Sequence, residues 1–519
     1  MKKIITLLAM AAGTSLFSQT FVLDATFADN GIKVFQDESF YPRDVKLINS
    51  KYYFIGTGNN FIDGNYCKIT KLNYNGSKDD SFGTGGDKIL SVPGETFSLK
   101  GFKYSNGSFY IYGKSVTPTE SSDIVIAKLD ENGNYDVAFG TNGIAKINLG
   151  GNEELADLVF DASNNLFCTG SRSVEGSPTV ARLITFKITE NGTLDTSFDP
   201  SGYKEYHINS ASSGNFITNY AGGYILAGNE SHYETVEGSS QVLHDDLLLV
   251  KINADGVPVT SFGTNGYKLL PLQTNYNNTI NKVQLHSNAI FLDYISSWSF
   301  QNTEREIVSF DLATDEATTI NNSYFSGEFD VMEDGIYSTG AFRCMQANPP
   351  CDSNFELRRI NFDGTVDTTF HINGLYSYSW PGTLYSSAIS YTLNKDDNGK
   401  ILMAGYLNRA YVNNNGQMAG ESGFTLLRLV EGELSTKDTD GPAASIYPNP
   451  FSDRLTIQSG LDIKEIAIFD MSGRKVGIPK VTNEAGSYTI YPNLNQNGVY
   501  LLRAVTADGQ EIVEKIVKQ

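Results

Sequence analysis

The five histidines are the first residues to consider for chemistry, because imidazole serves both as a metal ligand and as a general base. No two of them stand at the spacing of a metal site or a catalytic triad; they are His207, His232, His244, His286 and His371. The sequence also lacks the HExxH, GxSxG and Walker patterns of zinc proteases, serine hydrolases and nucleotide-binding loops. No constellation of acid, base and nucleophile is visible along the chain, which favours a non-catalytic protein.

Alternating side-chain oxygens form the best candidate for an ion site. Asp130, Asn132, Asn134 and Asp136 place an oxygen on every second residue, the spacing by which calcium loops bring their ligands to one point. The glycine, however, stands at the fourth place of this series rather than the sixth, and Thr141 takes the place where a calcium loop has Glu. Asn and Asp in turns also bond their own backbone without a metal. Two interpretations remain open, a calcium loop and a metal-free turn, and no other cofactor is expected.

The oxygen series belongs to a sequence motif that recurs along the chain and reads (D/N)-G-x-x-D-x-(S/T)-F-x-x-x-G. The Asp at the fifth position and the Ser or Thr are present in most full copies, and the Gly residues and the Phe in all of them. Copies begin at Asn75, Asn132, Asn191, Asp255 and Asp363, and a half copy, LDATFADNG, begins at Leu23. A period of roughly 57 residues makes each copy part of one supersecondary unit. The interval from Phe262 to Phe370 holds two units, with a degenerate one around Phe325, so we expect seven.

Each unit also contains a hairpin whose second strand ends in glycine, at Gly56, Gly113, Gly170, Gly228, Gly340 and Gly405; the fifth copy, AIFLDYIS, lacks it. A third strand ends in Lys or Arg before the motif Phe, and a short fourth strand follows the motif glycine. This pattern predicts an all-β fold, a seven-bladed β-propeller of four-stranded blades over residues 19–432. Because the chain opens with the second half of a unit and GFTLLRLVEG is the first half of one, we expect the two ends to complete one blade and close the ring.

The recurring residues are predicted to be structural. We expect the motif Phe to pack between blades, and the motif Asp to accept backbone N–H bonds in a turn; the Asp residues are Asp24, Asp79, Asp136, Asp195 and Asp367. Only departures from the repeat then offer places for a specific function. These are ESHYETVEGSSQVLHDD in the fourth unit, the fifth unit with Trp298, and the loop CMQANPPC in the sixth.

The net charge and the N-terminal residues indicate where inside or outside the cell the protein acts. The net charge of −20 argues against nucleic acid or an anionic membrane as a partner, since both need a basic surface. Lys2 and Lys3, the apolar run 4–12 and small residues up to Ser18 predict a signal peptide over residues 1–18, cleaved before Gln19. The run is too short to span a bilayer and no other segment approaches its length, so we expect no transmembrane segment after cleavage.

The chain has 4 cysteines, and export would permit disulfides. Cys344 and Cys351 bracket the polar loop CMQANPPC, so we expect them to form a disulfide. Cys67 and Cys168 lie in apolar alternating segments that favour buried free thiols, with a second bridge between them as the alternative.

The tail differs from the repeats. After a polar linker at 433–444, residues 445–519 show the short alternating strands of a small Ig-like β-sandwich. They resemble the type A C-terminal sorting domain of the type IX secretion system of Bacteroidota, through YPNPF, DMSGRKV, GVYLLR and the terminal KIVK. The resemblance implies passage through the general export pathway to the periplasm and transport across the outer membrane by the type IX machinery. It also implies cleavage of the tail, with attachment to surface lipopolysaccharide or release.

The repeats from Phe21 to Gly432 resemble the delta-60 repeat family of large bacterial extracellular proteins, which is regarded as propeller forming and has no assigned catalytic residues. Two functions are therefore weighed. One is a secreted or cell-surface propeller, non-catalytic, that binds a glycan or protein ligand. The other is a propeller-type polysaccharide lyase or hydrolase whose carboxylates gather at the central mouth from different blades, because a ring brings together residues that are distant in the chain.

Overall fold

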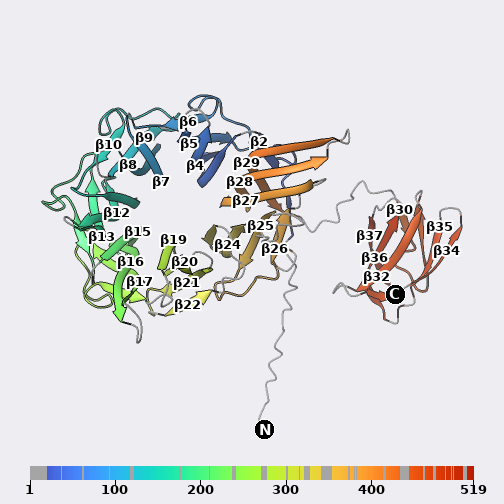
Figure 1. Ribbon diagram of the computed structural model, residues 1–519. Coiled ribbons are helices and arrows are strands. Elements are labelled where there is room, and N and C mark those ends of the chain that lie inside the picture. Colours follow the sequence, from blue (N-terminus) through green and yellow to red (C-terminus); the bar gives the residue numbers. More distant parts are fainter. Residues whose placement is uncertain are drawn as a thin grey trace, which may run out of the picture. The chain divides into compact units, whose positions relative to one another are not determined.

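Figure 1 shows the computed structural model, in which the chain divides into two compact units, Met1–Gly432 and Glu433–Gln519. The structure describes residues 20–519 apart from 37, 61–63, 93, 117–121, 175–176, 210, 236–240, 271–276, 300–301, 315, 321–327, 341–353, 372–373, 379, 381–382, 413–416, 433–443, 460–461, 471–474, 478, 485–486, 493, 495 and 507–510. The regular elements of these residues are β-strands. Among them, no helix has the length and hydrophobicity needed to cross a bilayer.

The first unit is a β-propeller, and six of its sheets are four consecutive antiparallel strands each. Blade 1 is β3 (Phe40–Ile48), β4 (Lys51–Asn60), β5 (Gly64–Asn73) and β6 (Asp87–Leu90). Blade 2 is β7 (Thr96–Ser105), β8 (Ser108–Val116), β9 (Asp123–Asp130) and β10 (Ile144–Ile147). Blade 3 is β11 (Glu153–Phe160), β12 (Leu166–Val174), β13 (Ser177–Ile188) and β14 (Lys204–Tyr206).

The next three blades repeat this order. Blade 4 is β15 (Ala211–Tyr220), β16 (Gly223–Thr235), β17 (Gln241–Asn253) and β18 (Tyr267–Leu270). Blade 5 is β19 (Asn277–His286), β20 (Ala289–Ser299), β21 (Asn302–Asp311) and β22 (Ala317–Ile320). Blade 6 is β23 (Phe329–Met332), β24 (Gly335–Gly340), β25 (Phe355–Ile360) and β26 (Leu375–Tyr378). The degenerate unit is blade 5, whose loop between β21 and β22 contains no Phe; Phe325, around which this unit was expected, comes after β22 in the chain and lies outside the described residues.

Blade 7 is built from both ends of the unit. Its strands β27 (Thr383–Lys395), β28 (Ile401–Val412) and β29 (Met418–Glu431) follow blade 6, while β1 (Phe21–Leu23) and β2 (Ile32–Gln36) come from the N-terminal end. Both N-terminal strands pair antiparallel with β29, with Val22 opposite Val430 and Val34 opposite Thr425. The predicted closure is confirmed, and it leaves no open sheet edge at the junction.

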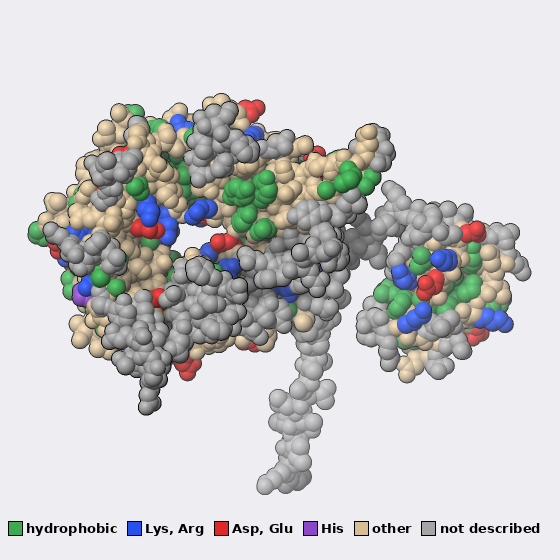
Figure 2. Space-filling view, viewed as in Figure 1, with side chains coloured by type: hydrophobic (Ala, Val, Ile, Leu, Met, Phe, Trp, Pro, Cys, Tyr) green, Lys and Arg blue, Asp and Glu red, His purple; other side chains and the backbone are tan. Residues whose placement is uncertain are grey.

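The first strand of each blade forms the inner wall of the ring. These strands contact one another in a closed circle, in the order β3, β7, β11, β15, β19, β23, β27 and back to β3. Figure 2 shows the opening that they surround, with Lys, Arg, Asp and Glu side chains and a hydrophobic patch around it.

The glycine expected to end the second strand instead lies inside it in most blades, as where β8 continues past Gly113 to Val116; a bulge in the first strand explains why this position is glycine. In blade 2, β7 is bulged between Leu99 and Gly101, and the Ser98 carbonyl turns toward Gly113 of β8. A Cβ added to Gly113 would lie 2.0 Å from that oxygen, a distance that no side chain tolerates. The same close approach occurs at Gly56, Gly170, Gly228 and Gly405.

The motif loop joins each blade to the next. The ring of Phe82, from blade 1, packs on Gly133 of blade 2, and the Gly83 amide donates to the Asn132 carbonyl at 3.3 Å. The motif Phe side chains are buried, except for the half-buried Phe198; the buried ones are Phe27, Phe82, Phe139, Phe262 and Phe370. The prediction that Phe packs between blades is confirmed.

The two ends of every blade carry different connections. Because the strands alternate in direction, the motif loop between the third and fourth strands lies at the same end as the turn between the first and second; we call this the motif end. The turn between the second and third strands lies at the opposite end, the hairpin end. The long β16–β17 hairpin of the fourth unit therefore projects from the hairpin end.

The second unit is a two-sheet sandwich. One sheet has the order β30 (Ala444–Tyr447), β31 (Leu455–Ser459), β35 (Ser487–Tyr491) and β34 (Lys480–Glu484). The other has the order β33 (Lys475–Gly477), β32 (Ile463–Asp470), β36 (Gly498–Thr506) and β37 (Glu511–Lys518). Leu455, Ile457 and Ile490 of the first sheet share one core with Ile468 and Leu502 of the second, as a small sandwich requires.

Candidate functional site

Bulges in the inner strands give the channel wall its chemistry. A β-bulge leaves one residue unpaired and re-aims its side chain, and among the described residues it occurs at the same place in six inner strands. We call these unpaired residues the bulge ring: Arg43, Lys100, Ala156, Asn215, Asn281 and Tyr391. Their types differ from blade to blade, unlike those of the motif residues. The bulge ring is therefore a departure from the repeat of the kind that a specific site needs.

Three tyrosines from two blades form one cluster on this wall. Tyr41 lies on β3 of blade 1, and its ring centroid lies 5.1 Å from that of Tyr406 and 6.1 Å from that of Tyr391, both in blade 7. The Tyr41 ring stacks on Tyr406, while Tyr391 stands edge-on to it. Burial and the neighbouring phenols raise the pKa of Tyr41 and of Tyr391, so the cluster stays uncharged. Tyr41 is nevertheless 38% exposed, which leaves part of an aromatic ring facing solvent.

Basic side chains lie beside the tyrosines. Arg43 and Lys100 are the exposed bulge residues of blades 1 and 2, whose inner strands contact each other. Lys100 shares Glu154 with Lys114, at 3.5 and 3.0 Å. Burial would raise the pKa of Glu154, but the two lysines outweigh burial and lower it. Two lysines therefore share one carboxylate, which leaves one unmatched positive charge beside the exposed Arg43.

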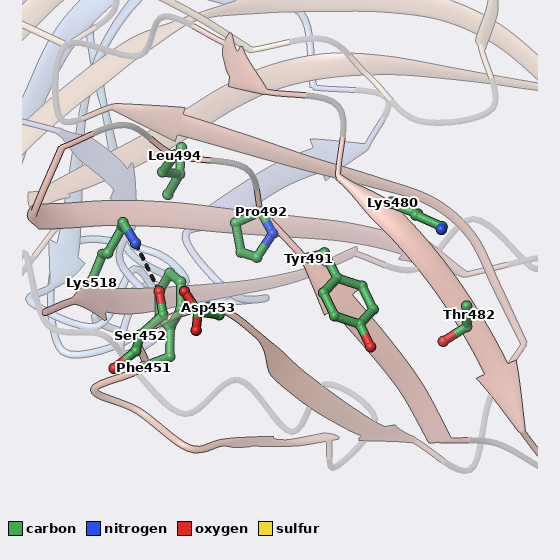
Figure 3. A pocket seen from close by; sticks show the side chains of 9 residues that line it. All are labelled: Phe451, Ser452, Asp453, Lys480, Thr482, Tyr491, Pro492, Leu494 and Lys518. Carbon is green, nitrogen blue, oxygen red and sulfur yellow. Dashed lines mark hydrogen bonds between the residues drawn. The ribbon is translucent and has the colours of Figure 1, made fainter.

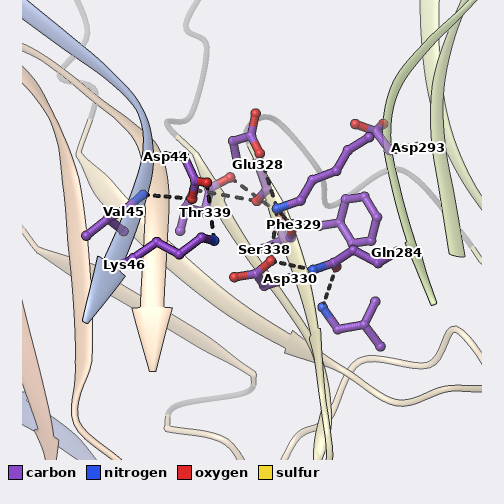
Figure 4. A network of polar contacts seen from close by, with 12 residues as sticks. Asp44, Val45, Lys46, Gln284, Asp293, Glu328, Phe329, Asp330, Ser338 and Thr339 are labelled. Atoms are coloured by element: carbon purple, nitrogen blue, oxygen red, sulfur yellow. Dashed lines mark hydrogen bonds and ion pairs between the residues drawn. The ribbon is translucent and has the colours of Figure 1, made fainter. Parts of the chain in front are cut away.

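A second polar group occupies the wall of blades 5 and 6 (Figure 4). Lys282 lies 2.9 Å from Asp330 and 3.5 Å from Glu328, and Gln284 donates to Asp330 at 2.8 Å. Burial would lower the pKa of Lys282, but Asp330 and Glu328 raise it. Burial raises the pKa of Glu328, with Lys282 opposing this shift. Glu328 is therefore the carboxyl of this group that holds a proton most readily.

The missing glycine of the fifth unit has a counterpart in this region. Tyr294 of β20 stands where other blades have the glycine, and the residue before it, Asp293, is fully buried. The guanidinium of Arg305 donates to both of its carboxylate oxygens. Together with Asp44 of blade 1, shown in Figure 4, carboxylates from three blades face this part of the channel, and none belongs to the repeat.

The oxygen series considered for calcium forms a turn. Asp130 Oδ1 accepts the backbone N–H groups of Asn132 and Asn134 at 2.9 and 2.8 Å, and Oδ2 accepts the Asn134 side-chain amide at 3.0 Å. Asp136 is turned away toward Lys128, at 2.8 Å. Among the described residues, no group of three or more His, Cys, Asp or Glu side chains is arranged to hold a metal ion.

The motif Asp residues accept the backbone amide two residues ahead, as predicted, at 2.9–3.2 Å; the donors are Thr26, Ser81, Ala138, Ser197 and Thr369. Sequence reasoning missed the second use of these carboxylates. The basic residue that ends the third strand forms an ion pair with the motif Asp in four blades: Lys71 with Asp79, Lys128 with Asp136, Arg359 with Asp367 and Arg428 with Asp24. The fixed spacing of Lys or Arg before the motif Phe was the signal that could have predicted it.

The cysteines fall into two sets. Cys67 and Cys168 are buried and free, as the apolar pattern favoured. Cys344 and Cys351 lie outside the described residues.

A carboxyl with a strongly raised pKa lies between blades 2 and 3. Burial raises the pKa of Glu153 to about 7, and the charge of Asp123 adds to the shift. Glu153 is 1% exposed, and neither carboxylate oxygen has a hydrogen-bond partner among the described residues. Asp123 also has one oxygen without a donor, while Lys146 holds the other at 3.0 Å.

The second unit contains a pocket of about 610 Å³ between its first sheet and the C-terminal strand (Figure 3). Phe451, Asp453, Tyr491 and Lys518 are among its lining residues. Beside the pocket, the YPNPF turn holds the last strand. Asn449 donates to the Lys515 carbonyl at 2.7 Å and accepts the Val517 amide at 2.8 Å. Two of the sequence signatures of the tail therefore bind each other.

Comparisons with known proteins agree with this division. Residues 445–519 match the family described as the secretion system C-terminal sorting domain. No curated protein sequence matches the chain. Among solved structures, the chain is similar to the β-propeller domain of the Trilobed protease from Pyrococcus furiosus, at 10% identity and TM-score 0.37, over 74% of this chain and 96% of that one.

Two further structures are similar to a comparable extent. One is a puromycin-hydrolysing peptidase of Mycobacterium tuberculosis, at 13% identity and TM-score 0.38, covering 85% of this chain and 61% of that one. The other is the α-L-arabinanase of Cellvibrio cellulosa in complex with arabinohexaose, at 12% identity and TM-score 0.29, covering 55% and 96%. These likenesses say nothing about activity. The chain is a β-propeller followed by a C-terminal sorting domain, exported by the type IX secretion system.

Proposed function

We propose that this protein is a non-catalytic propeller, secreted or held at the cell surface, that binds a glycan on its channel wall. The observation that supports this is the cluster of Tyr41, Tyr391 and Tyr406, with Tyr41 38% exposed. An exposed aromatic face suits the apolar C–H face of a sugar ring, while the phenol hydroxyls and the polar bulge ring can bond sugar hydroxyls.

A glycan array probed with the full mature chain tests the proposal. Tyr41→Ala should abolish or weaken every hit at least tenfold, because it removes the stacking surface. Tyr491→Ala is the matched control, since Tyr491 is also 38% exposed but lies in the sorting domain. If Tyr41→Ala retained full binding, or if the array gave no hit while a protein partner was captured through this wall, the ligand would not be a glycan on Tyr41.

A second candidate, a polysaccharide hydrolase or lyase, is favoured by the carboxylates of blades 1, 5 and 6. Glu328 with its raised pKa would be the acid, and Asp330, which pairs with Lys282, would be the base or nucleophile. Release of reducing or unsaturated ends from a polysaccharide, lost in Glu328→Gln and retained in Glu190→Gln on an exposed turn, would establish this function in place of the first.

The proposal also covers the domain boundaries of the chain and its processing during export. Residues 1–18 would be a signal peptide, residues 433–444 a linker, and the seven units delta-60 repeats. Outside the cell, loss of the tail at 445–519 would accompany attachment to lipopolysaccharide or release. N-terminal sequencing of the exported protein should begin at Gln19, and the mass of the surface form should lack the tail.

Export would also allow Cys344 and Cys351 to bridge. The intact exported protein should then be two mass units lighter than its reduced form, the mass of two hydrogens, with Cys67 and Cys168 still free. Alkylation of all four cysteines without reduction would contradict the bridge.

A further inference from the structure

Positive charge is concentrated on one side of the bulge ring, in the blades next to the tyrosine cluster. Tyr391, Arg43 and Lys100 are the bulge residues of blades 7, 1 and 2, which are consecutive around the closed ring. The next two described members of the bulge ring after Ala156 are the neutral Asn215 and Asn281. An aromatic arc thus passes directly into a basic arc.

Arg43 is the residue of this arc with a free charge. It is exposed, and it forms no ion pair with any residue that the structure describes. The nearest acidic residue in sequence, Asp44, lies 3.3 Å from Lys46, so its charge is already balanced. Glu154 is shared by Lys100 and Lys114, which leaves these two lysines with one unmatched positive charge.

The spacing fits one sugar residue. Arg43 follows Tyr41 by two positions on β3, so even with the bulge between Pro42 and Asp44 their Cα atoms lie at most about 7 Å apart, a gap that a sugar ring and a long Arg side chain can bridge. A sugar ring stacked on Tyr41 would therefore carry a ring substituent within reach of the Arg43 guanidinium. Guanidinium groups pair with carboxylate and sulfate oxygens through two parallel hydrogen bonds.

We infer that the channel wall selects an anionic glycan, with a sugar ring on Tyr41 and its carboxylate or sulfate on Arg43 and Lys100. The inference rests on the proposed glycan function and names the class of glycan. Uronate and sulfate esters share the anionic chemistry that these two side chains recognise, so separate probes must distinguish them.

The experiment measures binding of the full mature chain to three probes: oligogalacturonate, the same oligomer with its carboxylates methyl-esterified, and a sulfated heparin oligosaccharide. We expect at least one anionic probe to bind tenfold or more tightly than the esterified one. Its affinity should fall as salt is raised, because both basic side chains are exposed. Preference for oligogalacturonate identifies a uronate, and preference for heparin identifies a sulfate.

Variants separate this inference from the function on which it rests. Arg43→Gln with Lys100→Gln should weaken the anionic probe about tenfold and leave the esterified probe unchanged, whereas Tyr41→Ala should weaken both. Lys464→Gln, at an exposed position of the sorting domain, is the control for loss of one positive charge. Equal binding of the esterified and free oligomers would overturn the anionic selectivity alone. Failure of all three probes, with array hits confined to neutral glycans, would also overturn it and leave the glycan function standing, whereas no hit of any kind would overturn both.

Discussion

Arg428 and Asp24 are 404 residues apart in the chain and form a buried ion pair in which the Arg428 Nε lies 2.9 Å from Asp24 Oδ2. In the other blades that have this pair, both partners come from one continuous segment, as with Lys128 and Asp136. In blade 7 the base comes from β29 and the acid from the N-terminal half motif. The Arg428 guanidinium also lies 4.4 Å from the ring centroid of Phe27, which belongs to the same half motif.

Arg428→Met should therefore open the ring. It leaves the Asp24 carboxylate buried beside Lys400 alone, and breaking a buried pair costs roughly 3–5 kcal/mol of unfolding free energy. Urea titration measures this cost. Lys128→Met removes the equivalent base within one blade, where Asp136 is half exposed, and should cost about 1 kcal/mol or less. Equal losses of unfolding free energy in the two variants would mean that the pair that closes the ring stabilises the protein no more than a pair within one blade.

The same pair gives a pH dependence. Burial alone would raise the pKa of Asp24, but hydrogen bonds from Lys400 and Thr26 and the charge of Arg428 hold it well below its ordinary value of 3.8. Since the folded-state pKa is lowered, the stabilisation is present above pH 4 or so and is lost as the pH falls toward the folded-state value. In Arg428→Met this acid-side loss should be smaller, as measured by the denaturation midpoint across pH 2–6.

Phe139→Ala should destabilise the joint between blades 2 and 3. The fully buried ring packs on Gly192, where an added Cβ would lie 3.1 Å from it, so its removal leaves a cavity between blades. The expected cost is roughly 3–5 kcal/mol. Val137→Ala, two residues earlier and 74% exposed, should change the unfolding free energy by less than about 0.5 kcal/mol. A cost below about 1 kcal/mol for Phe139→Ala would refute the packing role.

Glu153→Gln should stabilise the protein above neutral pH. Because the folded-state pKa of about 7 exceeds the ordinary value of 4.5, Glu153 favours the fold while both states are protonated and loses this advantage as the pH rises from 4.5 to 7. The full penalty is on the order of 3 kcal/mol. The variant should gain most of it at pH 8 and nothing at pH 4.5, as followed by thermal unfolding. Glu190→Gln, on an exposed turn, is the control, and an equal gain at both pH values would exclude ionisation as the cause.

Removing divalent ions with EDTA should leave the melting temperature within about 2 °C of its original value. The Asp130 oxygens already accept three N–H groups from Asn132 and Asn134, so a calcium ion would have to displace them. A fall of many degrees, reversed by added calcium, would instead show that the turn is a calcium loop.

The repeat made most of the fold predictable. The split units at the two ends predicted that β1 and β2 would pair with β29. The Asp before each motif Phe predicted a turn in which its carboxylate accepts a backbone N–H group. Both follow from local chemistry that the repeat displays several times. The channel wall could not be predicted in the same way. Tyr41 and Tyr391 meet only because the ring closes. The bulges at Arg43 and Lys100 show in the sequence only indirectly, as the glycines of the neighbouring strand that the bulged backbone approaches closely.

The opposite positions of the motif end and the hairpin end allow the two to be engineered independently. All joints made by Phe and Gly lie at the motif end, so loops there cannot be exchanged without loosening a neighbour. The β16–β17 hairpin at the hairpin end runs well beyond the short β18 and contributes nothing to those joints. Foreign peptides grafted between Thr235 and Gln241 would be displayed on a ring whose assembly does not depend on them, and the sorting domain would carry the display outside the cell.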